Sequence, residues 1–240
     1  MMKKVIRFFL AGLLLVGATA AWAQDEIETT VSGDVVSSYI WRGQDLGDVS
    51  LQPTLGVSYK GLSLTAWGSV GLTDPLDTKE FDLTLSYTTG GLNIGITDYW
   101  FDAGLDPDAR YFKYDAHGTN HVFEANIGYD FGVASVQWFT NFAGNDGINK
   151  DGKRAYSSYA EVVVPFKLSA IDWTATVGAV PYATSFYNDW TSGFAVTNVS
   201  LKATKDIKVT DSFSIPVFGQ IAANPCTQKA YLVFGFTLQP

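Results

Sequence analysis

Apolar and polar residues alternate with a period of two along most of the chain beyond residue 30. Segment 80–88 shows this best, because its odd positions are apolar from Phe81 to Tyr87 and its even positions are polar from Glu80 to Thr88. Successive side chains of a strand point to opposite faces, so each such segment predicts a strand with one apolar face. Twelve segments fit: 31–43, 51–60, 62–72, 80–88, 92–101, 121–131, 133–143, 156–167, 171–181, 194–204, 213–222 and 229–238.

The connections between these segments alternate in length. Those after even-numbered segments are short, as at 60–61 and 168–170, whereas those after odd-numbered segments are polar and mostly long, as at 102–120 and 144–155. An outer-membrane barrel has tight turns at one end and long loops at the other, and a soluble sandwich has no reason to sort its loops in this way. We therefore predict an all-β fold: a transmembrane antiparallel up-and-down β-barrel of about 12 strands in a single domain over residues 24–240.

Aromatic residues near the predicted strand ends fit two interfacial girdles, although aromatics also favour strands in general. The residues expected at the periplasmic rim are Tyr59, Tyr87, Tyr129, Phe131, Phe166, Trp173, Phe213 and Phe236. Those expected at the external rim are Tyr39, Trp41, Trp100 and Phe142.

The N-terminus has the pattern of an export signal. An apolar run from Phe8 to Val16 follows three basic residues, and Ala21-Trp22-Ala23 is a small-residue cleavage site. We expect residues 1–23 to direct Sec export and to be removed after Ala23. An exported barrel implies the outer membrane of a Gram-negative bacterium, with outer-membrane lipid and lipopolysaccharide as its surroundings.

Composition excludes several other classes of protein. Loss of the three basic residues of the signal, from 16 in total, would leave 13 against 24 acidic residues. So acidic a chain is not expected to bind nucleic acid, because phosphate neutralisation needs clustered cations. The one cysteine, Cys226, excludes an internal disulfide framework and a cysteine-based zinc site.

One segment also carries a family resemblance. The stretch from Gly33 to Gly43 reads GDVVSSYIWRG, and it resembles the TorF-type putative porins, also described as the GCW family of exported proteins, whose first strand ends in aromatic-x-aromatic-Arg-Gly. Residues 66–69 and 80–83 are similar as well, although Thr65-Ala66-Trp67 replaces the Gly-Cys-Trp of the family. The resemblance implies an outer-membrane barrel and supplies neither a substrate nor a catalytic residue.

Charged residues on the polar faces are the candidate pore lining. A charge on the lipid face of a barrel is costly, so these side chains are expected to face the lumen. Four acids against two bases favour the passage of cations or neutral solutes, and we predict a passive pore for small solutes or ions. Alternatively, Arg42 pairs with a carboxylate and side chains fill the interior. The six residues are Arg42, Glu80, Asp82, Glu124, Glu161 and Lys202.

Other candidate chemistry is sparse. His117 and His121 lie near Asp115 in a loop, but no serine stands in a G-x-S-x-G turn. The loops at 106–108 and 149–152 contain oxygen ligands but do not fit the EF-hand pattern. We expect no enzymatic activity, no cofactor and no specific metal site. Two alternatives stay open: a barrel enzyme acting on lipid or lipopolysaccharide, and a secreted soluble β-sandwich that binds glycans through aromatics.

Overall fold

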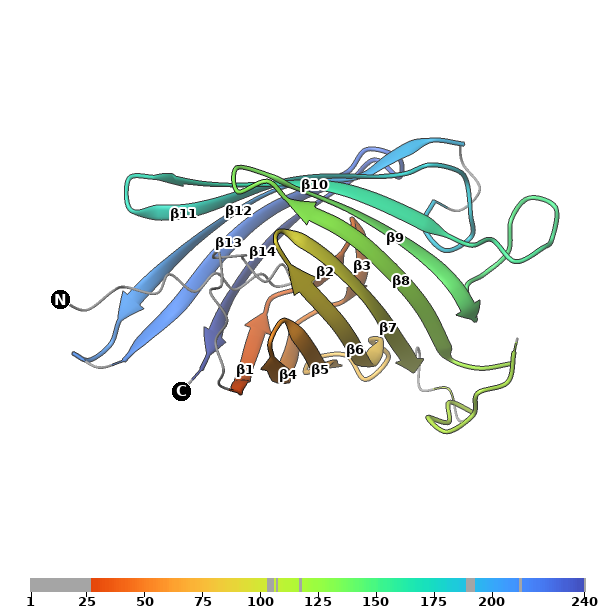
Figure 1. Ribbon diagram of the computed structural model, residues 1–240, viewed down its shortest axis with the longest axis horizontal. Coiled ribbons are helices and arrows are strands. Elements are labelled where there is room, and N and C mark those ends of the chain that lie inside the picture. Colours follow the sequence, from red (N-terminus) through yellow and green to blue (C-terminus); the bar gives the residue numbers. More distant parts are fainter. Residues whose placement is uncertain are drawn as a thin grey trace.

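Twelve strands form one closed antiparallel barrel, and two more form a separate hairpin (Figure 1). The computed structural model describes residues 27–102, 106, 108–116, 118–188, 193–211 and 213–239, so the predicted export signal lies outside the described residues. The described part of the chain contains no helix of the length and apolarity needed to cross a membrane. The strands are β1 (Glu28–Val36), β2 (Tyr39–Trp41), β3 (Gln44–Gly47), β4 (Ser50–Tyr59), β5 (Leu62–Gly71), β6 (Lys79–Thr89), β7 (Leu92–Asp102), β8 (His121–Asp130), β9 (Ser135–Gly144), β10 (Ser158–Leu168), β11 (Ile171–Val180), β12 (Ala195–Lys208), β13 (Ser214–Asn224) and β14 (Lys229–Leu238).

The barrel closes between its first and last strands. β1 pairs antiparallel with β14 on one side and with β4 on the other, and the remaining barrel strands pair in chain order. Closure leaves no free edge strand, although β1 and β14 pair over only four residues of each. The predicted up-and-down barrel is confirmed, and the alternative of a β-sandwich is wrong because one sheet closes on itself.

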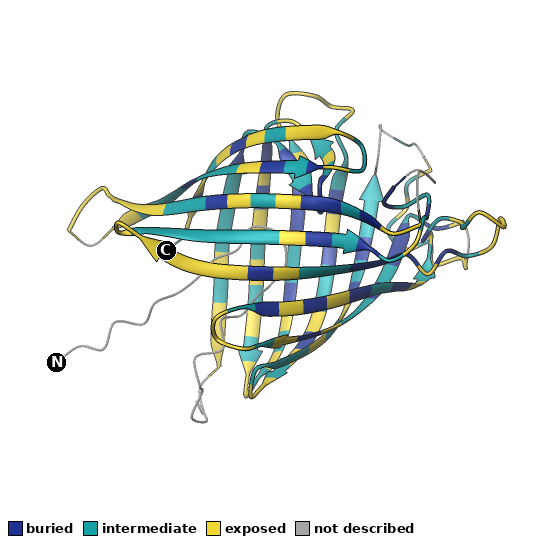
Figure 2. Cartoon of the chain, turned by 90° about the horizontal axis from the view of Figure 1, so that it is seen from above, coloured by how far each residue is buried: buried dark blue, intermediate teal, exposed yellow. Residues whose placement is uncertain are grey.

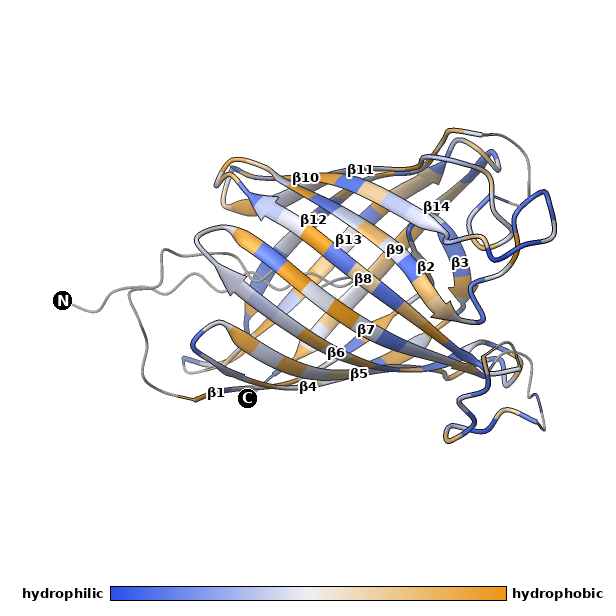
Figure 3. Cartoon of the chain, turned by 45° about the vertical axis from the view of Figure 1, so that its right-hand side comes forward, coloured by the Kyte–Doolittle hydropathy of each residue, from blue (hydrophilic) through white to orange (hydrophobic). Residues whose placement is uncertain are grey.

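The two ends of the barrel differ as the loop pattern predicts. At one end, the turn end, strands are joined by tight connections such as Lys60-Gly61, whose φ angles of 48° and 84° are those of a type I′ hairpin turn. At the other end, the loop end, the connections are long, and they extend to the right in Figure 3. β1 begins and β14 ends at the turn end, as an even number of up-and-down strands requires.

The distribution of polarity is the inverse of that in a water-soluble protein. Along β6, Leu85 and Tyr87 are 51% and 41% exposed on the outer face, whereas Glu80, Asp82 and Ser86 are buried on the inner face. A similar alternation of buried and exposed positions runs along many of the other barrel strands (Figure 2). Apolar side chains therefore cover the outside, and most polar side chains face inward.

The aromatic residues predicted for the turn end lie on the outer face, where all but the half-buried Trp173 are well exposed. Phe142 is also exposed near the loop end, but Tyr39 and Trp41 are not girdle residues, since both are buried inside the barrel. The predicted strand 31–43 was too long. β1 ends at Val36, and the chain then turns inward to form the β2–β3 hairpin.

Candidate functional site

The β2–β3 hairpin fills part of the barrel interior at the loop end (Figure 3). Tyr39 donates a hydrogen bond from its hydroxyl to Glu80 Oε2 of β6 at 2.8 Å. At the hairpin tip, Asn224 of β13 donates from Nδ2 to the carbonyl oxygen of Gly43 at 3.1 Å. The hairpin is therefore anchored to widely separated strands of the wall, and it lies across the lumen.

The tip of the hairpin is a strained two-residue turn. Trp41 pairs with Gln44, and the residues between them, Arg42 and Gly43, have φ angles of 50° and 81°. This is the backbone of a type I′ turn, in which asparagine, aspartate or glycine is usual at the first position and arginine is not. A β-carbon on Gly43 would overlap the carbonyl oxygen of Thr197, so only glycine lets the tip approach β12.

Replacing Gly43 with alanine is expected to destabilise the protein by about 1–3 kcal/mol more than the same change at Gly90. Both glycines have positive φ, but a β-carbon on Gly90 meets nothing within 4 Å. The difference between the variants therefore isolates docking of the hairpin tip. Urea unfolding of the barrel in detergent micelles measures it, and equal losses would mean that the tip is not pressed against β12.

Arg42 makes the central interaction of the interior. Its Nη1 and Nη2 lie 2.5 Å and 2.9 Å from Oε2 and Oε1 of Glu124 on β8, a two-bond ion pair with both side chains almost fully buried. Tyr99 donates from its hydroxyl to Glu124 Oε1 at 2.9 Å, and Arg42 Nη1 donates to the hydroxyl of Tyr187. Burial by itself lowers the pKa of Arg42, but the carboxylate of Glu124 holds that pKa well above its usual value.

Aromatic rings surround the same guanidinium group. Its central carbon lies 4.4 Å from the ring centroid of Trp41, 4.1 Å from that of Phe139 and 4.8 Å from that of Tyr159. A fourth ring, that of Tyr187, is 5.8 Å away. A cation over aromatic faces is attracted by their electron-rich centres, and the attraction grows when water is excluded. The loop half of the lumen thus holds an aromatic cluster, which the prediction of a polar inner face did not include.

The other predicted lumen residues occupy separate positions on the inner wall. Glu80 and Asp82 face the interior together on β6, and Asp82 Oδ1 is buried with no hydrogen-bond partner among the described residues. Glu161 accepts a hydrogen bond from the Tyr159 hydroxyl at 3.1 Å. Lys202 Nζ lies 3.7 Å from the ring centroid of Phe218. The structure therefore brings Arg42 and Glu124 into contact but leaves Lys202 outside that cluster.

The sequence prediction does not include the aromatic neighbours of Arg42. One signal was present, because Phe139 shares its face of β9 with Gln137 and Asn141 and is therefore apolar at a polar-face position. An aromatic residue among inward polar ones indicates that something packs against it inside the barrel.

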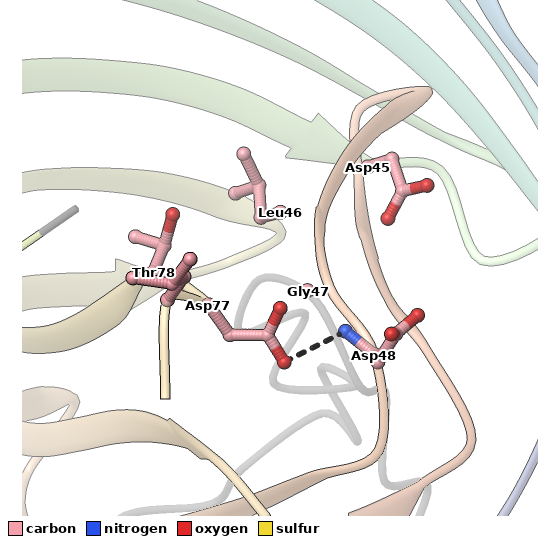
Figure 4. Close-up of a pocket in the computed structure, with 7 residues that line it drawn as sticks. Asp45, Leu46, Gly47, Asp48, Asp77 and Thr78 are labelled. Atoms are coloured by element: carbon pink, nitrogen blue, oxygen red, sulfur yellow. Dashed lines mark hydrogen bonds between the residues drawn. The ribbon is translucent and has the colours of Figure 1, made fainter. Parts of the chain in front are cut away.

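Acidic side chains gather beside the base of the hairpin. They line a pocket of about 280 Å³ between the β2–β3 hairpin and the loop after β5 (Figure 4). Asp77 Oδ2 accepts a hydrogen bond from the backbone N–H of Asp48 at 3.1 Å, which ties the loop to the hairpin. Burial raises the pKa of Asp45, and the negative charge of Asp48 raises it further. The described residues contain no group of three or more His, Cys, Asp or Glu side chains placed to hold a metal ion.

His121 lies on the outer face rather than in the lumen. Its Nδ1 is 2.7 Å from Asp98 Oδ1, and its Nε2 is 2.5 Å from the carbonyl oxygen of Tyr111. Both ring nitrogens therefore have an oxygen partner within hydrogen-bond distance. No ring nitrogen is then left to activate a nucleophile. His117, the other candidate, lies outside the described residues.

The oxygen-rich loops form local turns. Asn149 Oδ1 accepts hydrogen bonds from the backbone N–H groups of Asp151 and Lys153, and Asp106 Oδ1 accepts one from that of Asp108. Side-chain oxygens engaged with the backbone two residues on are characteristic of Asx turns.

Comparisons with known proteins give no family for the chain. No protein-family model matches the chain, and no curated protein matches its sequence. Among solved structures, the chain is similar to an outer membrane channel from Pseudomonas putida F1, with 12% sequence identity and a TM-score of 0.40. The similarity covers 87% of this chain and 94% of that one.

Proposed function

We propose that this chain is an outer-membrane β-barrel of a Gram-negative bacterium, and that its interior is a passive path for small solutes or ions. One observation carries the proposal: apolar side chains cover the outside of a closed cylinder whose inside is mostly polar. Hydrocarbon offers no hydrogen bonds, so a sheet that spans a membrane must have no free edge and an apolar outer face.

The proposed orientation places the turn end in the periplasm and the loop end outside the cell. Exposed rings at the turn end, such as Tyr129 and Phe131 with centroids 4.8 Å apart, fit the position of an interfacial girdle. Outer-membrane lipid and lipopolysaccharide would then surround the barrel. Sec export and removal of the signal after Ala23 are part of the same proposal.

We further propose a preference for cations. The carboxylates of Glu80, Asp82 and Glu161 face the interior. Among the described residues, none of the three forms an ion pair like that between Arg42 and Glu124. The hairpin narrows the loop half of the lumen, so a permeating solute would pass close to these groups. Negative side chains that line a narrow passage favour cations.

Planar bilayers that separate unequal KCl concentrations test both points. The folded protein is expected to give small discrete conductance steps. The reversal potential should differ from zero, with the sign that a preference for potassium over chloride produces. Replacing Glu80 by Gln together with Asp82 by Asn should shift the reversal potential toward zero. The matched control Asp211→Asn, at a fully exposed site of the turn end, should leave the reversal potential unchanged. Absence of conductance from folded protein at several voltages would contradict the pore.

Membership of the TorF-type putative porins is also a proposal. Its support is the segment from Gly33 to Gly43. The aromatic-x-aromatic-Arg-Gly part of that segment is the inward hairpin tip, which includes Arg42 and Gly43. In this interpretation, the signature residues shape the constriction of the lumen.

A further inference from the structure

Most of the groups that hold the Arg42 side chain belong to the barrel wall, and Trp41 of the hairpin and Tyr187 of the loop after β11 complete the set. Glu124 is on β8, Tyr99 is on β7, and the nearest two wall rings, Phe139 and Tyr159, are on β9 and β10. Each is at most 4% exposed. The wall thus presents a receptor for a guanidinium group, and a side chain of the inserted hairpin occupies it.

The receptor matches the chemistry of a guanidinium more closely than that of other cations. A carboxylate that accepts two parallel N–H bonds fits the planar fork of a guanidinium, whereas an ammonium ion acts as a point charge. Rings on several sides fit a flat, weakly hydrated cation that stacks on aromatic faces. A neutral solute would leave the carboxylate of Glu124 buried and unpaired.

Two features show that Arg42 is an imperfect occupant. Its Nε is buried with no hydrogen-bond partner among the described residues. Its backbone has a φ angle of 50°, a region that residues with a β-carbon rarely adopt and that costs free energy. A separate guanidinium compound would bear neither constraint, because it is not attached to the turn.

We propose that Glu124, Tyr99, Phe139, Tyr159 and Tyr187 form a binding site for guanidinium-bearing solutes, and that Arg42 is its built-in competitor. A solute that takes the site displaces Arg42 and frees the hairpin tip from the wall. The solute thereby widens its own path through the lumen. This inference rests on the proposed function and names a solute class for it.

The first test empties the site. Purified Arg42→Ala protein is heated with methylguanidinium or methylammonium chloride at equal millimolar concentrations. Methylguanidinium is expected to raise Tm by about 5 °C as it binds the folded state, and methylammonium is not. The control Arg42→Ala/Glu124→Gln, which lacks the carboxylate, should not respond to either cation. An equal response to both cations, or none to methylguanidinium, overturns the proposal.

The second test keeps Arg42 in place, so it does not depend on the stability of the Arg42→Ala protein. Thr197 is fully buried beneath the hairpin tip, so a Thr197→Cys thiol in a Cys226→Ser background reacts with a maleimide only when the tip moves. Methylguanidinium should speed labelling about tenfold, a typical coupling between two sites. Methylammonium should not, and an Asp211→Cys thiol at the exposed turn end should label at an unchanged rate.

The two proposals fail separately. Faster labelling without bilayer conductance overturns the pore and supports the site. Conductance with labelling that methylguanidinium leaves unchanged overturns the site and supports the pore. Methylguanidinium could raise the Tm of the Arg42→Ala protein and yet leave the labelling rate of the Arg42-containing protein unchanged. In that case the solute binds only a cavity made by truncation of Arg42, and the proposal is overturned.

Discussion

Replacement of Glu124 by glutamine is expected to lower the free energy of unfolding by about 3–5 kcal/mol, because the guanidinium of Arg42 then stays buried without its counter-charge. Both side chains of the pair are 3% exposed or less. Water therefore cannot replace the lost carboxylate without moving the hairpin. Urea unfolding in detergent micelles, followed by tryptophan fluorescence, measures the change.

The control removes both charges at once. Arg42→Met combined with Glu124→Leu leaves no unpaired ion, and it is expected to be much more stable than Glu124→Gln alone, since well-packed apolar pairs often match buried ion pairs. If Glu124→Gln costs less than about 1 kcal/mol, the pair behaves like a solvated surface pair. That result would contradict the buried geometry.

Replacement of Ile96 by arginine is expected to cost about 2–4 kcal/mol in lipid bilayers, the cost of a cation at the bilayer midplane on a barrel surface. Ile96 is 50% exposed on the outer face, and it pairs with Leu85 near the middle of β6 and β7. Folding titrations into phospholipid vesicles at increasing urea concentrations measure the loss.

The matched control is the same substitution at an outer-face residue nearer the membrane interface. Leu62 is 52% exposed on the same outer face but begins β5 at the turn end. The same change to arginine there should cost only about 0–1 kcal/mol, as near an interface. Equal costs at Leu62 and Ile96 would mean that the outer surface does not lie in hydrocarbon, and the membrane assignment would then fail.

The barrel strands could be predicted because their information is local. In β6, each residue from Phe81 to Tyr87 shows by its polarity which face it occupies, and the structure keeps that register. Glu80, Asp82 and Glu124 follow the same parity, since all three are buried on the inner face. A two-residue period needs no knowledge of distant partners.

The inward hairpin could not be predicted in this way. Tyr39, Ile40 and Trp41 are aromatic or β-branched residues, which favour strands, so the local pattern extends the first strand to residue 43. Whether the chain continues along the sheet or turns into the lumen depends on partners elsewhere. Those partners include Glu80, which accepts the hydroxyl of Tyr39, and Asn224, which holds the tip.

By itself, the sequence determined the closed barrel, its loop end and turn end, and the faces of its strands, because alternation and loop length are properties of neighbouring residues. The sequence also offered the interpretation in which Arg42 pairs with a carboxylate inside the barrel, but only the tertiary structure decided which carboxylate that is and what surrounds the pair. The ion pair of Arg42 joins residues 82 positions apart, and the bond to Gly43 joins residues 181 apart. Such contacts exist only after the sheet has closed and brought distant strands around one lumen.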